Sequence, residues 1–250
     1  MQRSAAFIAR LFTFGVVLTA SIVSHAEDRP VDVELILAID SSDSINRVEY
    51  RVQRDGLADA FRDPLFHKAV VSGPNQAIAV LIFEWAGQYH QELRSDWRLI
   101  DSPEAALALA DEINGYERIL DNGVTSISGA IEFAISQYTG NGYDGFRKVL
   151  DISADGRHNQ GRKLGKAREE ALNRDITING IAILSEMPDL NRYFEYWVIG
   201  GFGAFVEVAR SHEDYPRAIL AKLLREVRHV PLGSLPPTSP STELAKGVEQ

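Results

Sequence analysis

The residues best suited to chemistry in this sequence form a polar run directly after an apolar segment. The apolar segment covers residues 33–39, and the run that follows is Asp40-Ser41-Ser42-Asp43-Ser44. In an extended chain, residues two positions apart point to the same side, so Asp40, Ser42 and Ser44 can present three oxygens to one point. An all-oxygen donor set favours a hard cation, Mg²⁺ first, with Mn²⁺ and Ca²⁺ as alternatives.

Two further polar clusters, far from Asp40 in the sequence, also lie at the end of a predicted strand or the start of a predicted helix. Thr125 lies in Gly123-Val124-Thr125, just before a helical pattern, and Asp155 lies in Asp155-Gly156, just after an apolar strand pattern. In an open parallel sheet, ligands bind beyond the carboxyl ends of the strands. We therefore expect both clusters to lie beside Asp40 in the folded protein.

The elements that must position these residues alternate between strand and helix patterns. Apolar or alternating runs predict strands at 33–39, 77–85, 88–99, 147–152, 175–184 and 203–209. Helical spacing of apolar residues predicts helices at 46–61, 103–113, 126–138, 162–174 and 213–227. This alternation predicts an α/β, doubly wound fold with a mostly parallel central sheet flanked by helices. The more polar segment 88–99 is predicted to be an antiparallel edge strand.

The three polar clusters together resemble the metal-ion-dependent adhesion site (MIDAS) of von Willebrand factor A (VWA) domains. Asp40, Ser42 and Ser44 match the Asp-x-Ser-x-Ser motif, Thr125 matches the lone downstream threonine, and Asp155 matches the Asp-Gly motif. The chain also resembles, more loosely, a bacterial family of exported VWA-like proteins. The resemblance covers residues 31–230 and implies that these five residues hold the cation, with Asp40 and Asp155 often acting through bound water.

The resemblance implies a non-enzymatic binding module that docks an acidic side chain. Hydroxyl ligands leave the cation short of negative charge, so it accepts an Asp or Glu of a protein partner. The sequence departs from the family pattern at two positions. Asp43 stands where many family members have glycine, and Ala154 stands where threonine usually precedes the Asp-Gly motif. The role of Asp43 is not explained by the sequence.

Three alternatives to this interpretation stay open at the level of sequence. Asp and Ser commonly cap helices, so the 40–44 run can serve the helix that begins near Asn46. The same ion can act as a Lewis acid in a hydrolase, although the sequence contains no nucleophile elbow and no evident general base. Ala154 supports a third alternative, a structural VWA domain that binds no metal.

Several weaker candidates complete the set of functional residues. His158 follows Asp155 closely and is a candidate for the rim of the site, although a lone loop histidine is more often solvated. Asp121 and Asn122 fit a turn, and Trp85 fits core packing. The aromatic segment 193–208 is either a core segment around a glycine turn or an exposed partner surface.

The two ends of the sequence differ in composition from the centre. Residues 1–26 combine Arg3 and Arg10, a short apolar stretch and Ser24-His25-Ala26, which predicts a signal peptide cleaved after Ala26. Residues 231–250 are rich in Pro, Ser and Thr, which predicts a flexible tail. The predicted location is periplasmic or secreted, with no stable membrane insertion after cleavage.

Composition excludes several classes of partner and site. The chain has no cysteine, which excludes disulfides and thiolate metal sites. Its 35 acidic residues outnumber its 26 basic residues and give a formal net charge of −9. Such a surface repels nucleic acid and anionic lipid, so we expect neither as a partner.

Overall fold

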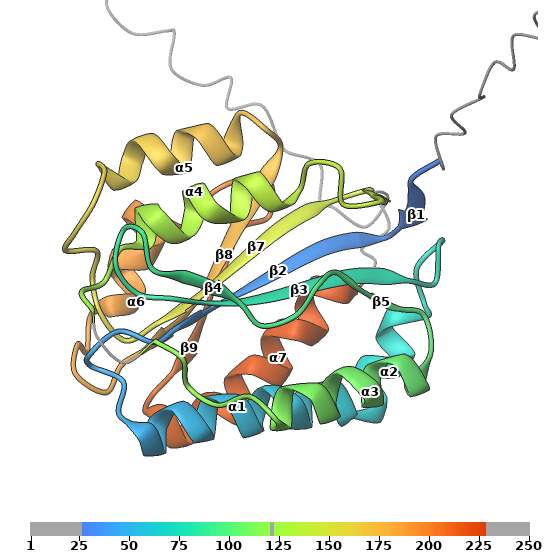
Figure 1. Ribbon diagram of the computed structural model, residues 1–250, viewed down its shortest axis with the longest axis horizontal. Helices are drawn as coiled ribbons and strands as arrows, with labels where there is room; N and C mark the ends of the chain where they lie inside the picture. Colours follow the sequence, from blue (N-terminus) through green and yellow to red (C-terminus); the bar gives the residue numbers. More distant parts are fainter. Residues whose placement is uncertain (1–26, 121–122, 229–250) are drawn as a thin grey trace, which may run out of the picture.

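The computed structural model describes residues 27–120 and 123–228 and contains one large sheet between two layers of helices (Figure 1). The predicted signal peptide, the predicted tail, Asp121 and Asn122 lie outside the described residues. No helix within the described ranges is long and apolar enough to cross a membrane.

The central sheet has seven strands and runs in the order β4-β3-β2-β7-β8-β9, with β5 also paired to β3. Its strands are β2 (Val33–Asp40), β3 (Ile78–Trp85), β4 (Gln91–Leu93), β5 (Arg98–Ile100), β7 (Lys148–Ala154), β8 (Ile176–Ile183) and β9 (Val206–Ala209). All pairings among β3, β2, β7, β8 and β9 are parallel, and only β4 and β5 pair antiparallel with β3. The expected mostly parallel sheet with an antiparallel edge is confirmed.

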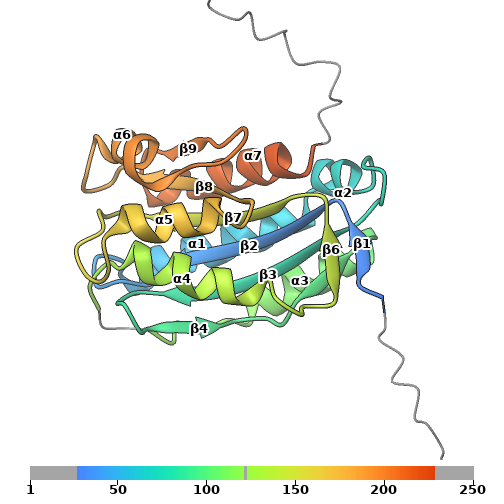
Figure 2. The same ribbon diagram turned by 90° about the horizontal axis from the view of Figure 1, so that it is seen from above.

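Helices cover both faces of this sheet (Figures 1 and 2). One face carries α1 (Arg47–Arg62), α2 (Pro64–Val70), α3 (Pro103–Asn114) and α7 (Tyr215–Val227). The other face carries α4 (Ile127–Gln137), α5 (Leu164–Leu172), α6 (Leu190–Tyr193) and a π-helix, η1 (Phe194–Val198). A single 3₁₀ turn, η2 (His212–Asp214), leads into α7.

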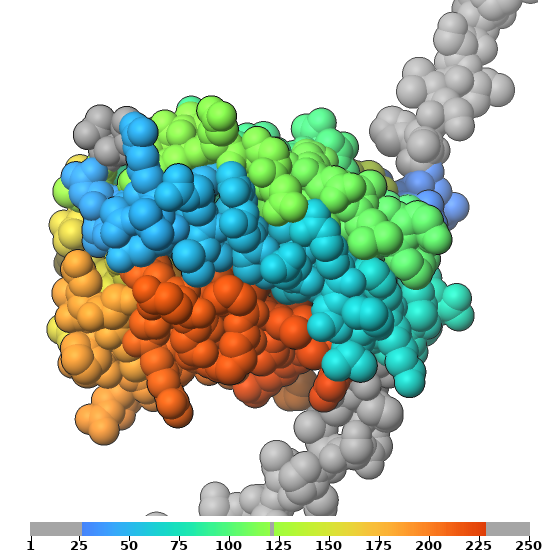
Figure 3. All heavy atoms as spheres, turned by 90° about the horizontal axis from the view of Figure 1, so that it is seen from below, coloured from blue at the N-terminus to red at the C-terminus, as the bar shows by residue number. Residues whose placement is uncertain are grey.

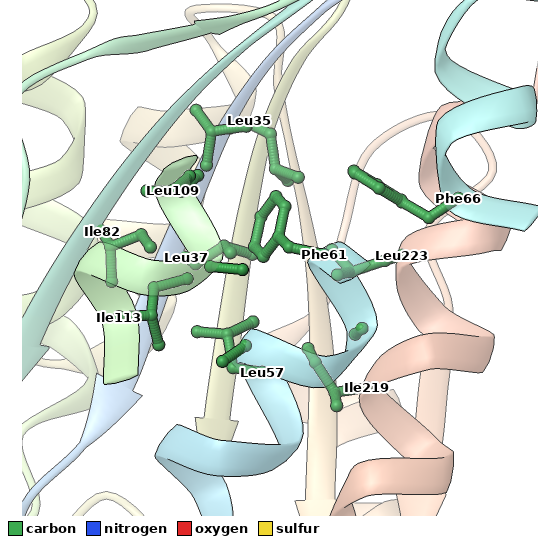
Figure 4. Packing of buried hydrophobic residues seen from close by; sticks show 14 of the residues in the cluster. Leu35, Leu37, Leu57, Phe61, Phe66, Ile82, Leu109, Ile113, Ile219 and Leu223 are labelled. Carbon is green, nitrogen blue, oxygen red and sulfur yellow. The ribbon is translucent and has the colours of Figure 1, made fainter. Parts of the chain in front are cut away.

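Apolar side chains pack on both faces because β2, β3, β7 and β8 are buried on both sides, as expected for central parallel strands. On the α1 face, Phe61 and Leu57 of α1 meet Leu37 of β2 and Leu223 of α7 (Figure 4). Figure 3 shows the outside of this layer, where α1 lies between α3 and α7. This packing holds the strand ends that carry the polar clusters.

The edge segment 88–99 differs from its prediction because it is not one continuous strand. The backbone amides of Arg94 and Ser95 both donate to the carbonyl oxygen of Ile82, at 2.8 and 3.3 Å. Two residues opposite one form a bulge, which interrupts the ladder. The Ser95 hydroxyl also accepts from the Ile82 amide at 3.1 Å and so replaces a backbone acceptor. The segment therefore divides into β4 and β5.

Several short elements were not predicted. Helix α2 follows α1 directly, with Asp63 capping the Leu65 amide at 2.7 Å. Strands β1 (Arg29–Val31) and β6 (Tyr143–Gly145) form a separate two-stranded parallel sheet beside the amino end of β2. Each has only three residues, too few to give a sequence pattern.

The order of the strands reverses next to β2, and this reversal fixes where a ligand can bind. The chain passes from β2 to its neighbour β3 on one side and later returns to β7 on the other. Such a switch point leaves a crevice at the carboxyl ends of the two diverging strands. Here Asp40 is the last residue of β2, and Asp155 directly follows β7.

Candidate metal site

Asp40 ends β2 with a carboxylate that is fully buried. Its Oδ1 accepts a hydrogen bond from the Ser42 amide at 2.7 Å, which turns the chain sharply after the strand. Its Oδ2 is also buried but has no hydrogen-bond partner. A buried carboxylate oxygen without a partner is unfavourable unless a ligand compensates it.

The serine hydroxyls connect Asp40's loop to the end of β7. Ser42 Oγ lies 3.1 Å from Ser44 Oγ, and Ser44 Oγ donates to Asp155 Oδ1 at 2.7 Å. Asp155 Oδ2 is buried and has no hydrogen-bond partner, like Oδ2 of Asp40. The first and third motifs therefore meet, although 111 residues separate Ser44 from Asp155.

Thr125 lies against the same loop. A Cβ built on Gly156 would lie 3.4 Å from Thr125 Oγ1, so this hydroxyl is beside the Asp155-Gly156 turn. The Thr125 amide donates to Asn159 Oδ1 at 2.9 Å, and the Asn159 amide donates back to the Thr125 carbonyl at 2.9 Å. These reciprocal bonds hold the second motif to the third.

Asp43 has a definite structural role that the sequence did not reveal. Its Oδ1 accepts from the Gly123 amide at 3.0 Å, and its own amide donates to the Gly123 carbonyl at 3.0 Å. Asp43 thus joins the first motif to the loop that carries Thr125. Asp40 at the end of β2 and the loops that carry the other four predicted site residues are thus joined by direct contacts.

Burial acts on both carboxylates, and the charge of Asp155 also acts on Asp40. Burial, followed by the charge of Asp155, raises the pKa of Asp40 to about 7 from its ordinary 3.8. Burial also raises the pKa of Asp155, opposed by the Ser44 hydrogen bond and by His212. Both carboxylates are therefore destabilised as anions in the metal-free fold.

His212 is a site residue that sequence reasoning missed. It is 3 % exposed, and its Nε2 lies 3.8 Å from Asp155 Oδ2 without a hydrogen-bond partner. Its Nδ1 lies 3.0 Å from Ser185 Oγ and 3.4 Å from Glu49 Oε1. No motif surrounds this histidine in the sequence, and only the fold brings η2 to the end of β7.

A second layer of polar contacts supports the 40–44 loop from below. Arg118 Nη2 donates to the carbonyl oxygens of Ser41 and Ser42 at 2.9 and 3.1 Å. Ser41 Oγ donates to the fully buried Glu84 at 3.1 Å, and Tyr50 donates to the same carboxylate at 2.5 Å. Arg94 lies 3.2 Å from Glu84 and balances its charge. The loop is thus fixed through its backbone as well as through its own side chains.

The capping alternative fails because Asn46 caps α1. The Asn46 side-chain oxygen accepts from the amides of Val48 and Glu49 at 2.8 and 3.1 Å. The Glu49 carboxylate accepts in turn from the Asn46 amide at 2.8 Å, which completes a capping box. The polar run 40–44 is therefore not occupied in capping this helix.

The weaker candidates take ordinary positions. His158 Nε2 lies 3.0 Å from the Arg162 carbonyl oxygen, and burial lowers the pKa of this histidine. Trp85 is fully buried in the core. The segment 193–208 is divided: Phe194 and Val198 are buried, whereas three aromatic side chains are exposed, namely Tyr196, Trp197 and Phe202.

The donor set fits a hard divalent cation. Asp40 and Asp155 each have one buried carboxylate oxygen without a partner, and their other oxygens contact Ser42 and Ser44. Carboxylates combined with neutral hydroxyls suit Mg²⁺ or a similar ion. Within the described residues, no group of three or more His, Cys, Asp or Glu side chains could hold a metal. Any ion here would therefore depend on the hydroxyls of Ser42, Ser44 and Thr125.

Comparison with known proteins places the chain in a family. A family model described as "Protein of unknown function (DUF1194)" matches residues 30–231. The chain belongs to the DUF1194 family. A search of curated proteins finds no match to this DUF1194 chain.

Solved structures share the fold of the DUF1194 chain at low sequence identity. Proximal thread matrix protein 1 from the mussel byssus matches with a TM-score of 0.57 and 17% identity, over 81% of this chain and 48% of that one. The same protein with a zinc-occupied MIDAS motif gives a TM-score of 0.57 and 19% identity, with the same coverage. The pilus adhesin SpaC from Lactobacillus rhamnosus GG gives 0.55 and 11%, over 80% of this chain and 31% of that one.

The DUF1194 chain spans less than half the length of these solved proteins. The shared arrangement of sheet and helices confirms the VWA-like fold that the three motifs predicted.

Proposed function

We propose that this chain is an exported binding module that holds a divalent cation, Mg²⁺ first, and docks an acidic side chain of a protein partner on it. Ser42, Ser44 and Thr125 would supply hydroxyl oxygens, and Asp40 and Asp155 would act directly or through water. The bound cation would supply a positive centre that attracts a carboxylate. The chain's own residues hold and orient that centre at the switch point of the sheet.

One observation carries the proposal: Asp40 Oδ2 and Asp155 Oδ2 are buried, without hydrogen-bond partners, beside the hydroxyls of Ser42 and Ser44. In a fold that binds no ligand here, two such oxygens would only lower stability. A cation would compensate both oxygens at once and remove their mutual repulsion.

The surroundings of the site favour an incoming anion. The first turns of α1 and α4 begin within three residues of Ser44 and Thr125. Helix N-termini carry a partial positive charge, which repels a lone cation but attracts an anion. A carboxylate from a partner would therefore interact with the cation and with both helix ends. This charge distribution supports an acidic protein ligand.

Two solved proteins with the same fold support an adhesive role. One is a matrix protein of the mussel byssus, with a MIDAS motif occupied by zinc, and the other is a pilus adhesin. Export to the periplasm or the exterior agrees with such a role and with the signal peptide predicted at residues 1–26.

Calorimetric titration of metal-free protein with Mg²⁺, Mn²⁺ and Ca²⁺ tests the site. We expect one cation per chain for the wild type and no detectable binding for Asp40→Ala. Asp59→Ala is the matched control, because this acid on α1 is 75% exposed and makes only a long contact with Arg62. A wild type that binds none of the three ions would refute the metal site.

Capture of a partner tests the second half of the proposal. Wild type and Asp40→Ala are immobilised and incubated with envelope extract, with Mg²⁺ or with a chelator. We expect a protein that the wild type retains only with Mg²⁺ and that Asp40→Ala does not retain. Soluble acetate or glutamate at high concentration should release it. Capture that is unchanged by chelator would contradict docking through the ion.

One observation favours a metal-dependent hydrolase as a second candidate. His212 Nε2 lies beside Asp155 without a hydrogen-bond partner and could accept a proton from a water on the cation. Turnover of phosphoester or ester substrates that is lost in both Asp40→Ala and His212→Gln would support this function. Absence of turnover together with metal-dependent capture supports the binding module.

A further inference from the structure

A second cluster of buried ionisable groups lies within the sheet, away from the strand ends. Lys222 of α7 is fully buried, and Asp151 of β7 and Glu226 of α7 are 3 % and 1 % exposed. Asp151 points toward the α7 face, because its neighbours Leu150 and Ile152 pack on the opposite face. The cluster thus joins a central strand to the last helix.

The three side chains are in direct contact. Lys222 Nζ touches Asp151 Oδ1, and it lies 3.0 Å from Glu226 Oε1. Asn179, which is paired with Asp151 in register on β8, donates to the same Glu226 oxygen at 2.7 Å. The Phe205 amide in turn donates to Asn179 Oδ1 at 2.8 Å. Lys222 is therefore held between two carboxyl groups whose positions are fixed.

The surroundings exclude water and disfavour charge. The Phe205 ring lies 5.2 Å from Lys222 Nζ and is itself only 7 % exposed. Burial lowers the pKa of Lys222, opposed by the charge of Glu226. Two carboxylates and one ammonium would leave a net negative charge in this core, which is costly in a medium of low dielectric constant.

We infer that Lys222 and Asp151 form an intramolecular amide bond between Nζ and Cγ, with Glu226 as the proton relay. This cross-link is independent of the proposed cation. It would make the side chains of α7 and β7 one covalent unit across 71 residues of chain.

The reaction balances without any co-reactant. The lone pair of the neutral Lys222 amine attacks Asp151 Cγ, and a C–N bond forms. Glu226 accepts a proton from Nζ and delivers it to the departing Asp151 oxygen, so the C–O bond breaks and one water leaves. The starting proton count is the same for a neutral amine with a carboxylic acid as for an ammonium with a carboxylate. Glu226 ends in the state in which it began.

The geometry assigns distinct roles to the two acids. Asp151 Oδ2 is buried without a hydrogen-bond partner, so this oxygen can leave without breaking a hydrogen bond. Glu226 is held by Asn179 and lies one helical turn from Lys222 on the same helix, where it is placed to exchange protons. Fixed contact between amine and carboxyl replaces a bimolecular encounter, which accounts for reaction without an activating group.

Mass spectrometry of the denatured full chain tests the bond. We expect the wild-type mass to be lower by one water molecule than the mass calculated for its sequence from the N-terminal residue that the purified protein retains. Trypsin should release a single joined species, in which residues 149–157 are attached to residues 218–225, because acylated Lys222 is not cleaved. Separate peptides 149–157 and 218–222, together with a full intact mass, would overturn the inference.

Three variants separate a covalent bond from a buried ion-pair network. Lys222→Arg keeps a cation but cannot form the amide, so its mass should equal the sequence mass. Asp151→Asn should give the same joined peptide, because ammonia leaves in place of water. Glu226→Gln keeps both reacting groups and should reduce the joined fraction at least about tenfold at equal times. Complete joining in Glu226→Gln would refute the relay, and an unjoined wild type would refute the bond even if every variant misfolds.

Discussion

Replacing Asp40 by asparagine should stabilise the metal-free domain at neutral pH while abolishing metal binding. Asp40 is fully buried, and burial together with the charge of Asp155 raises its pKa to about 7. The ionised carboxylate therefore destabilises the folded state unless a cation compensates its charge. Asparagine keeps the shape and an acceptor for the Ser42 amide but carries no charge.

The sign of the pH dependence follows from this raised pKa. Well below pH 3.8, Asp40 is protonated in both states and makes no pH-dependent contribution to stability. As pH rises from about 4 toward about 7, the unfolded chain releases the proton while the folded chain retains it, so the free energy of unfolding falls. Above about pH 7 the folded chain releases its proton as well, and the loss is complete.

The magnitude comes from the difference between the ordinary and the folded pKa. One pKa unit corresponds to about 1.4 kcal/mol, so the charge costs the fold about 4 kcal/mol at about pH 8. The side-chain amide N–H that Asp40→Asn introduces would be buried without an acceptor, which costs about 1–3 kcal/mol. We expect Asp40→Asn to raise the metal-free free energy of unfolding by about 1–3 kcal/mol at about pH 8.

Urea denaturation followed by tryptophan fluorescence, with chelator and at pH values from about 4 to about 8, measures this difference. The gain should shrink toward the acid end of this range, and Asp59→Asn should show no such trend, since Asp59 is exposed. Saturating Mg²⁺ should stabilise the wild type and leave Asp40→Asn unchanged. A variant that is less stable than the wild type at the alkaline end, or a gain that does not vary with pH, would refute this reasoning.

Three further substitutions test the supports of the site and the core. Asp43→Ala removes the bond to the Gly123 amide, so calorimetry should show metal affinity weakened by about 2–10-fold rather than abolished. Glu84→Gln removes the counter-charge of Arg94, whose side chain is only 8 % exposed, and urea denaturation should show a loss of about 3–5 kcal/mol. Phe61→Ala empties a fully buried ring position, and the same assay should show about 3–5 kcal/mol lost with metal stoichiometry unchanged.

The long elements and the polar loops could be predicted because each has a local signature. The continuous apolar runs of β2, β3 and β8 are typical of strands buried on both faces, and the structure has them within one or two residues of the predicted bounds. The rule that ligands bind at the carboxyl ends of parallel strands predicted that Thr125 and Asp155 lie near Asp40. In the structure Asp155 contacts Ser44 of the Asp40 loop, and Thr125 lies beside Gly156.

The remaining features depend on contacts between distant residues. The bulge that divides 88–99 arises because Ser95 bonds to Ile82 across the sheet edge. His212 reaches Asp155, and Arg118 reaches the Ser41 carbonyl, only after the chain has folded. From the sequence, Asp43 was only an extra negative charge near the site. In the structure its hydrogen bond to Gly123 links two loops. None of these contacts leaves a periodic pattern in the sequence.

Strand β7 connects the proposed cation site to the proposed cross-link. β7 ends next to Asp155, where a partner would bind through the cation, and it carries Asp151 four residues earlier. A pull on the bound partner would load β7 along its length, and in a parallel sheet that load is otherwise resisted by hydrogen bonds to β2 and β8. An amide from Asp151 to Lys222 would pass the load covalently to α7, whose side chains are packed against α1 and α2. An adhesion site at the end of a cross-linked strand would therefore keep its geometry under tension, because the strand could not slide out without the last helix.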